Sequence, residues 1–193
     1  MSHVHTQYMT TDRIPVGSAI SVLVKQHGRI RDMFAAVRRA HGDGARELFD
    51  DLREMLAVHE AGEEMVLRPI SRDTAGARTV DACNQEEAEI SLFLAGLEQI
   101  GVDDPRFGQL FDRLEQAFLE HAEREEATEF PTVLAECDEQ DQATMGLRLA
   151  AAQQLAPTHP HPAIAGSTTG QYTVGPFASL LDRARDMFRH DDA

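Results

Sequence analysis

The chain has 193 residues, which is enough for one domain with a sizeable hydrophobic core and too few for two full domains. Its formal net charge of -15 argues against nucleic acid or an anionic membrane surface as partner, because both carry charge of the same sign. No apolar run reaches the roughly 18 residues that cross a bilayer, and the first residues lack the layout of a secretion signal, so we expect a cytoplasmic protein.

Clusters of glycine, proline and aspartate divide the chain into four long segments. The breaks fall at 41–44, 73–76 and 101–105. In the last break, Asp104 before Pro105 predicts an N-cap followed by proline in the first helical turn. Between the breaks, apolar residues recur at alternating steps of three and four, which is typical of helices that face a bundle core.

Each segment therefore carries one inward-facing seam, and no strand-like alternation competes with it. The predicted fold class is all-α. The seams, in chain order, consist of Ile20, Leu23, His27, Ile30, Phe34 and Val37; Phe49, Leu52, Leu56, His59, Glu63, Val66 and Ile70; Val80, Cys83, Glu87, Ile90, Leu94 and Leu97; and Phe107, Phe111, Leu114, Phe118, His121, Glu125 and Thr128.

Short connections force neighbouring helices to run antiparallel, which predicts an up-down-up-down four-helix bundle. An additional short helix is expected at 140–154. We divide the chain into an N-terminal arm (1–16), the bundle with its extra helix (17–155), a linker rich in proline, threonine, serine and glycine (156–176), and a C-terminal amphipathic helix (177–193). That last helix is too short to fold alone, so we expect it to dock on the bundle, to bind a protein partner or to form a homodimer.

Six polar residues interrupt the apolar seams at positions where the helical spacing demands a core side chain. A buried carboxylate without a partner costs several kcal/mol, so three of them on inward faces require compensation. A bound metal cation supplies it. The predicted metal ligands are His27, His59, Glu63, Glu87, His121 and Glu125.

The spacing of these residues places them at about one height in the bundle. Two residues of an antiparallel hairpin lie level when they are equally far from its turn. His27 and His59 are equally far from the first break. The same holds for Glu87 and His121 about the third break, and for Glu63 and Glu87 about the second. We therefore expect one cluster with ligands from all four helices.

The second and fourth segments repeat one motif, H-x-x-x-E-E-x-x-x-x-P, which begins at His59 and again at His121. Its histidine and first glutamate have the i, i+4 spacing that puts both groups on one helix face. A helical hairpin used twice is a route to a pseudo-symmetric two-metal centre. Glu63 and Glu125 would bridge the ions, and each histidine would bind through one nitrogen. Imidazole with carboxylate suits iron, manganese or zinc.

The paired motifs, with His27 one helix earlier, resemble the hemerythrin or HHE cation-binding family over roughly residues 17–137. The tail, with His-Pro-His-Pro at 159–162, is similar to bacterial members of actinobacterial type. The resemblance implies two iron ions, bridged by carboxylates and by an oxo or hydroxo group, that react with oxygen, peroxide or nitric oxide. The residues that match the family's ligand positions are His27, His59, Glu63, His121 and Glu125.

Position 87 departs from the family pattern, which usually has histidine on the third helix where this chain has Glu87. Oxygen-carrying members have a second histidine one turn further along, where Ser91 stands here. A set of three histidines and three carboxylates is more anionic and should favour ferric iron. We therefore expect redox turnover or sensing in place of reversible oxygen carriage.

Three functions stay open from the sequence. The first is sensing, scavenging or disproportionation of small oxidants, which as an enzyme would be a di-iron catalase-like activity. The second is an oxidase or oxygenase acting on a small organic substrate, for which Gly28 and Gly62 could leave space; they could equally permit close helix packing. The third is a non-enzymatic module that binds iron, zinc or manganese.

Other acidic residues beside the motifs are expected to form solvated helix faces, while one or two could orient a ligand histidine. These residues are Glu60, Glu64, Glu86, Glu89, Glu123 and Glu126.

The two cysteines, Cys83 and Cys137, are expected to be ordinary reduced thiols. Because they lie at the same end of an antiparallel helix pair, a redox-linked disulfide between them stays open.

Overall fold

The structure, a computed structural model, describes residues 14–155. All elements in this range are helical, which confirms the predicted all-α class, and none of these helices is long and apolar enough to cross a lipid bilayer. The predicted linker (156–176), the C-terminal helix (177–193) and the arm up to residue 13 lie outside the described residues. In chain order the elements are α1 (Ala19–Arg39), α2 (Asp43–Gly62), the π-helical turn η2 (Glu63–Leu67), α3 (Arg68–Thr74), α4 (Ala77–Ile100), α5 (Phe107–Arg124), the π-helical turn η3 (Glu125–Glu129), α6 (Phe130–Glu136) and α7 (Glu139–Leu155).

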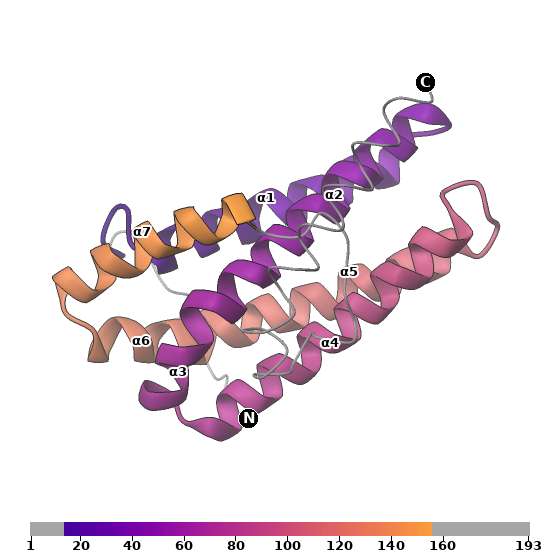
Figure 1. Cartoon of the computed structure of the whole chain (residues 1–193). Helices are drawn as coiled ribbons and strands as arrows, with labels where there is room; N and C mark the ends of the chain where they lie inside the picture. The colour runs from indigo at the N-terminus through magenta and orange to yellow at the C-terminus, as the bar shows by residue number, and fades with distance from the viewer. Residues whose placement is uncertain (1–13, 156–193) are drawn as a thin grey trace, which may run out of the picture.

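Two helical hairpins make the bundle: α1 packs against α2, and α4 packs against α5 (Figure 1). A glycine with positive φ stands at each of the three predicted breaks. The φ values are 59° at Gly42, 87° at Gly76 and 72° at Gly101. Glycine adopts this backbone region at little cost, so it can end one helix and redirect the chain into the next.

The start of α5 differs from the prediction. The Asp104 carboxylate accepts a hydrogen bond from the backbone N–H of Arg106 at 2.8 Å, and two more from its guanidinium. These bonds hold Pro105 in a turn. The helix therefore begins at Phe107, after the proline.

Two apolar cores share the bundle, with a polar layer between them. The larger core lies among the four long helices and contains Phe34. The smaller core forms where α7 packs against α1, α2 and η2, and it contains Leu149. Leu23 belongs to the smaller core and Ile30 to the larger one, so His27 lies at the boundary between them.

The predicted short helix is present as α7, and two glycines allow it to dock closely. A Cβ on Gly62 would lie 2.6 Å from Leu149 Cδ1, and one on Gly146 would clash with the carbonyl oxygen of Gly17. Gly62 thus serves close helix packing, the second of the two roles predicted for it. Gly28 is exposed and meets no neighbouring element.

A π-helical turn interrupts the second long helix of each hairpin at the first glutamate of the motif. The N–H of Arg68 donates to the carbonyl of Glu63, and the N–H of Phe130 donates to the carbonyl of Glu125. Each of these bonds spans five residues where an α-helix spans four, so the inward face shifts by one position. The predicted seam residue Thr128 is therefore exposed, while Phe130 is fully buried.

Candidate metal centre

All six predicted ligands lie in the polar layer between the two cores. Each is at most 3% exposed. The structure brings them together from four helices and from the starts of both π turns. They are His27 of α1, His59 of α2, Glu63 of η2, Glu87 of α4, His121 of α5 and Glu125 of η3.

The cluster divides into two sets of possible ligands that share two carboxylates. Within each set, one donor atom per residue lies within 4.8 Å of the donor atoms of the others. Because Glu63 and Glu125 belong to both sets, they stand where bridging carboxylates would be. The first donor group is His27, His59, Glu63 and Glu125, and the second donor group is Glu63, Glu87, His121 and Glu125.

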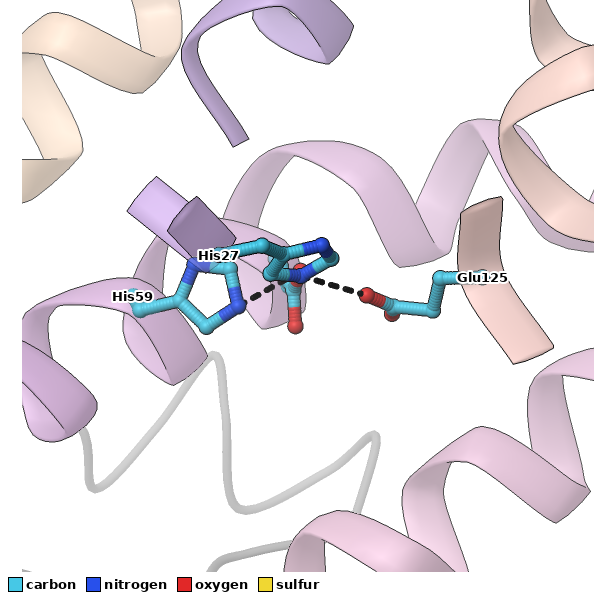
Figure 2. A group of neighbouring side chains, drawn as sticks. His27, His59 and Glu125 are labelled. Carbon is cyan, nitrogen blue, oxygen red and sulfur yellow. Dashed lines mark ion pairs between the residues drawn. The ribbon is translucent and has the colours of Figure 1, made fainter. Parts of the chain in front are cut away.

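In the first donor group, each residue contributes one buried atom that has no hydrogen-bond partner. These atoms are Nε2 of both histidines, Glu63 Oε1 and Glu125 Oε2. His27 Nε2 lies 3.3 Å from the Glu125 oxygen (Figure 2), and His59 Nε2 lies 3.2 Å from the Glu63 oxygen. Buried polar atoms nearly always find a partner, so four unpartnered atoms that converge on one point fit a metal ion.

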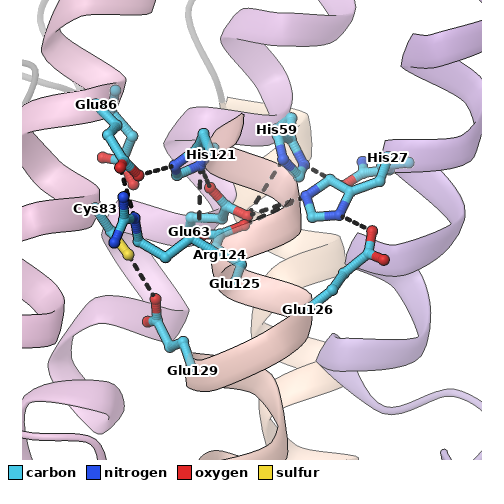
Figure 3. A network of polar contacts seen from close by, with 12 residues as sticks. His27, His59, Glu63, Cys83, Glu86, His121, Arg124, Glu125, Glu126 and Glu129 are labelled. Carbon is cyan, nitrogen blue, oxygen red and sulfur yellow. Dashed lines mark hydrogen bonds and ion pairs between the residues drawn. The ribbon is translucent and has the colours of Figure 1, made fainter. Parts of the chain in front are cut away.

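The outer nitrogen of each histidine is held by a side chain from a neighbouring helix. Figure 3 shows two of these contacts, made by Glu126 and Glu86. Such partners orient the ring and leave Nε2 directed at the cluster. Two of the acidic residues considered above therefore do orient histidines, whereas Gln26 was not predicted. The pairs are His27 with Glu126 at 2.8 Å, His59 with Gln26 at 3.1 Å and His121 with Glu86 at 3.4 Å.

A buried arginine enters the second donor group. Arg68 Nη2 lies 2.5 Å from a Glu125 oxygen and 3.4 Å from a Glu63 oxygen. The same nitrogen contacts Glu87, whose oxygen also accepts from Arg68 Nε at 2.8 Å. Arg68 Nη1 lies 2.6 Å from both oxygens of Glu129. The second donor group also has an unpartnered atom, Glu87 Oε2, but it differs in kind from the first because it surrounds a guanidinium.

Arg68 was not among the predicted site residues, yet the sequence carries a signal for it. In the repeated motif, Arg68 directly precedes Pro69, and Phe130 directly precedes Pro131. A charged residue thus stands where the second copy has an aromatic one. The three-and-four periodicity puts this position off the seam, and only the π turn directs it inward.

Burial and neighbouring charges set the ionisation of the shared carboxylates in opposite directions. Burial, and then the Glu125 carboxylate, raise the pKa of Glu63 to about 8. Burial also opposes ionisation of Glu125, but His121 and Arg68 outweigh it and hold the pKa of that carboxyl well below its usual range. Burial lowers the pKa of His59 well below its usual value, which favours the neutral form that binds metals.

The two cysteines are separate free thiols, as expected, and the disulfide left open above is not formed. Cys83 is buried, and its thiol donates to a Glu129 oxygen at 3.2 Å (Figure 3). Burial raises the pKa of the Cys83 thiol far above its usual value, so this residue stays protonated. Cys137 is half-buried.

Ser91 pairs with a carboxylate that belongs to neither donor group. Its hydroxyl donates to the Glu60 carboxylate, with both oxygens at 3.0 Å. Burial, and then the Glu64 and Glu87 carboxylates, raise the pKa of Glu60 well above its usual range. Ser91 therefore helps to satisfy a buried acid and offers no ligand.

A helical bundle with histidines and glutamates converging between its cores defines a protein of the metal-binding helical-bundle class. The hemerythrin HHE cation binding domain family matches residues 18–133 of the chain. The chain therefore belongs to this family, which confirms the resemblance of its motifs.

Two known proteins illustrate the relationship. An uncharacterized hemerythrin-like protein of Schizosaccharomyces pombe (strain 972) is 22% identical over 169 residues, which cover 86% of this chain and 83% of that protein. The crystal structure of a hemerythrin HHE cation binding domain-containing protein from Mycobacterium kansasii has a TM-score of 0.65 at 19% sequence identity, and covers 86% of this chain and 98% of that chain. The second similarity shows the shared fold.

Proposed function

We propose that this hemerythrin-like chain binds iron and reacts with oxygen, peroxide or nitric oxide, as a sensor, a scavenger or a peroxide-disproportionating enzyme. The observation that carries the proposal is the first donor group, whose two imidazole nitrogens and two carboxylate oxygens are buried, converge and lack other partners. Membership of the cation-binding family supports metal binding as such. Iron would supply the redox chemistry that imidazole and carboxylate groups do not.

The protein would hold the ion in place and keep bulk water away from it. The His27 ring lies 5.6 Å from the Phe130 ring and 5.8 Å from the Phe118 ring, so aromatic walls enclose this ligand. Gln26 and Glu126 fix the rings of the two histidines from outside. A site this buried suits a ligand of two or three atoms better than a large substrate.

The two-iron form predicted from the sequence would also use the second donor group. Its support is that Glu63 and Glu125 belong to both groups and could bridge two ions. Glu87 and His121 would then complete the second position, from which Arg68 would have to withdraw. Zinc or manganese suits the same donor atoms.

The other two functions have less support. An oxidase needs space for an organic substrate beside the metal, but Leu149 packs where a Gly62 side chain would stand, and Gly28 faces solvent. A non-enzymatic metal-binding module needs only the first donor group, so it differs from the leading proposal in reactivity and not in geometry.

The test begins with metal-free protein loaded with iron(II) in the absence of oxygen, followed by measurement of bound iron per chain. We expect tight binding, near-ultraviolet absorption bands after oxidation, and a reaction with peroxide or nitric oxide. His59→Ala is the binding control, and Arg72→Met, on the exposed side of α3, is the surface control. A protein that prefers zinc and leaves all three small ligands unchanged would overturn the proposal in favour of the module. Oxygen consumption that requires an added organic compound would point to the oxidase.

A further inference from the structure

We propose that the Arg68 guanidinium occupies the second metal position, so that the chain holds one metal ion, in the first donor group, and admits a second only when Arg68 is displaced. The proposal rests on the proposed function, because both concern the same metal centre. It replaces the second iron expected from the sequence with a side chain that carries a permanent positive charge.

The guanidinium nitrogen lies among the oxygens that a second ion would bind. Arg68 Nη2 is 2.5 Å from Glu125 Oε1 and 3.4 Å from Glu63 Oε2, and it contacts Glu87 Oε1. His121 Nε2, the fourth donor, is 3.4 Å and 3.6 Å from the same Glu125 and Glu63 oxygens. A metal ion at the roughly 2 Å of a metal–oxygen bond from these atoms would overlap the Arg68 nitrogen.

The other nitrogens of Arg68 hold the guanidinium in this position. Nη1 lies 2.6 Å from both oxygens of Glu129, and Nε lies 2.8 Å from Glu87 Oε1. Glu129 is fully buried and is fixed in turn by the Cys83 thiol. Because a planar guanidinium matches carboxylates through several donors at once, displacing it breaks all of these contacts together.

Charge explains why this half of the centre contains its own cation. Glu63, Glu87, Glu125 and Glu129 all contact Arg68, and all four are buried. Carboxylates this close repel one another and are costly to bury without a positive charge. The guanidinium provides that charge in the absence of any metal, whereas Glu63 Oε1 and Glu125 Oε2, the oxygens of the first donor group, make no hydrogen bond with it.

The repeated motif provides an internal comparison. Phe130, the counterpart of Arg68, stacks on His27 with ring centroids 5.6 Å apart and an interplanar angle of 14°. On the other side, Arg68 pairs with Glu87, the residue at the position that corresponds to His27. An aromatic residue thus accompanies a histidine ligand, and a guanidinium accompanies a glutamate. The two changes fit each other, which is expected if this half of the centre is built around arginine.

The experiment counts metal ions in the full chain. Metal-free protein is titrated with iron(II) under anaerobic conditions, and bound iron per chain is measured after gel filtration. We expect one ion in the wild-type protein, one in the control Arg72→Met, and two in Arg68→Met. After oxidation, electron paramagnetic resonance should show an isolated high-spin ferric ion in the wild type, and loss of that signal through spin coupling in Arg68→Met.

A second variant covers the case in which Arg68→Met does not fold. Arg68→Phe combined with Glu87→His copies the Phe130 and His27 pair, and it should bind two ions. Two tightly bound ions in the wild type would overturn the inference and leave the proposed function standing. One ion in the wild type and in every folded variant would equally refute the role of Arg68. A wild-type chain that binds no iron would instead remove the proposed function itself.

Discussion

The two halves of the metal centre are made by one repeated motif and differ in the side chain that follows the π turn. On the first side, Phe130 packs on His27, and the donor atoms around that ring are unpartnered. On the second side, Arg68 enters the cluster and pairs with Glu87. Two copies of one motif with the same π turn can therefore form either a donor group that needs a metal ion to balance its charge or a donor group that already contains a positively charged side chain.

The largest effect is expected when the internal cation is removed. Arg68→Met leaves its carboxylate partners without a counter-ion, and breaking a buried ion pair from one side typically costs about 3–5 kcal/mol. We expect the free energy of unfolding of the metal-free protein to fall by that amount in urea titrations. Arg72→Met, which removes an exposed pair with Asp81, should change it by less than about 1 kcal/mol. A similar small change in both variants would show that the buried ion pairs of Arg68 contribute no more to the free energy of unfolding than an exposed pair does.

The two motif histidines should differ in their importance for the first ion. His59→Ala removes a donor of the first group, and we expect the affinity for one iron(II) to fall by more than about 100-fold, beyond the usual effect of losing an outer partner. His121→Ala, the same change in the second copy, should reduce it much less. Competition with a chelator of known affinity measures both. Equal losses would contradict the asymmetry.

A smaller effect is expected from the residues that orient these histidines. Gln26→Ala frees the outer nitrogen of His59, and loss of such a partner lowers metal affinity by about tenfold or more. Glu86→Ala frees the corresponding nitrogen of His121 and should leave the affinity for the first ion nearly unchanged. The same chelator competition compares the two, and a larger loss in Glu86→Ala would reverse the assignment.

Taken per pH unit, the smallest effect concerns the shared carboxylate Glu63. Its pKa is raised from 4.5 to about 8 in the folded protein, so between these values the folded state binds more protons than the unfolded state. The metal-free protein should therefore lose stability as the pH rises through this window, by at most about 1.4 kcal/mol per pH unit. Metal binding should strengthen over the same window, because the competing proton leaves. Urea titrations at several pH values measure the first trend, and Glu63→Gln should reduce it, leaving the part that comes from the raised pKa of Glu60.

The sequence was sufficient to predict most of the fold, because local sequence patterns determine the helices and breaks of a bundle. Glycines at the breaks and apolar residues at steps of three and four located the hairpins, and the extra helix appeared as α7. The six inward polar residues were found by the same periodicity, since each stands on a seam.

What the sequence did not predict depends on contacts between distant elements. The π turns break the periodicity after Glu63 and Glu125, so Thr128 was placed inside and Arg68 was overlooked. Gln26 gave no signal, because an exposed-looking amide acquires its role only when α1 and α2 pack together. The close docking of α7 on Gly62 likewise follows from tertiary packing and not from local pattern.

The π turns also make the length of each motif a determinant of its chemistry. A residue inserted in 64–67, beyond the one that the π turn already accommodates, would rotate all that follows by about 100° about the helix axis. The guanidinium would then leave the acidic pocket, although every side chain of the centre is still present. The same insertion in 126–129 would carry Phe130 off the His27 ring. A single codon gained between a motif glutamate and the proline is therefore enough to change which side chain, or which ion, balances the charge at the centre of this bundle.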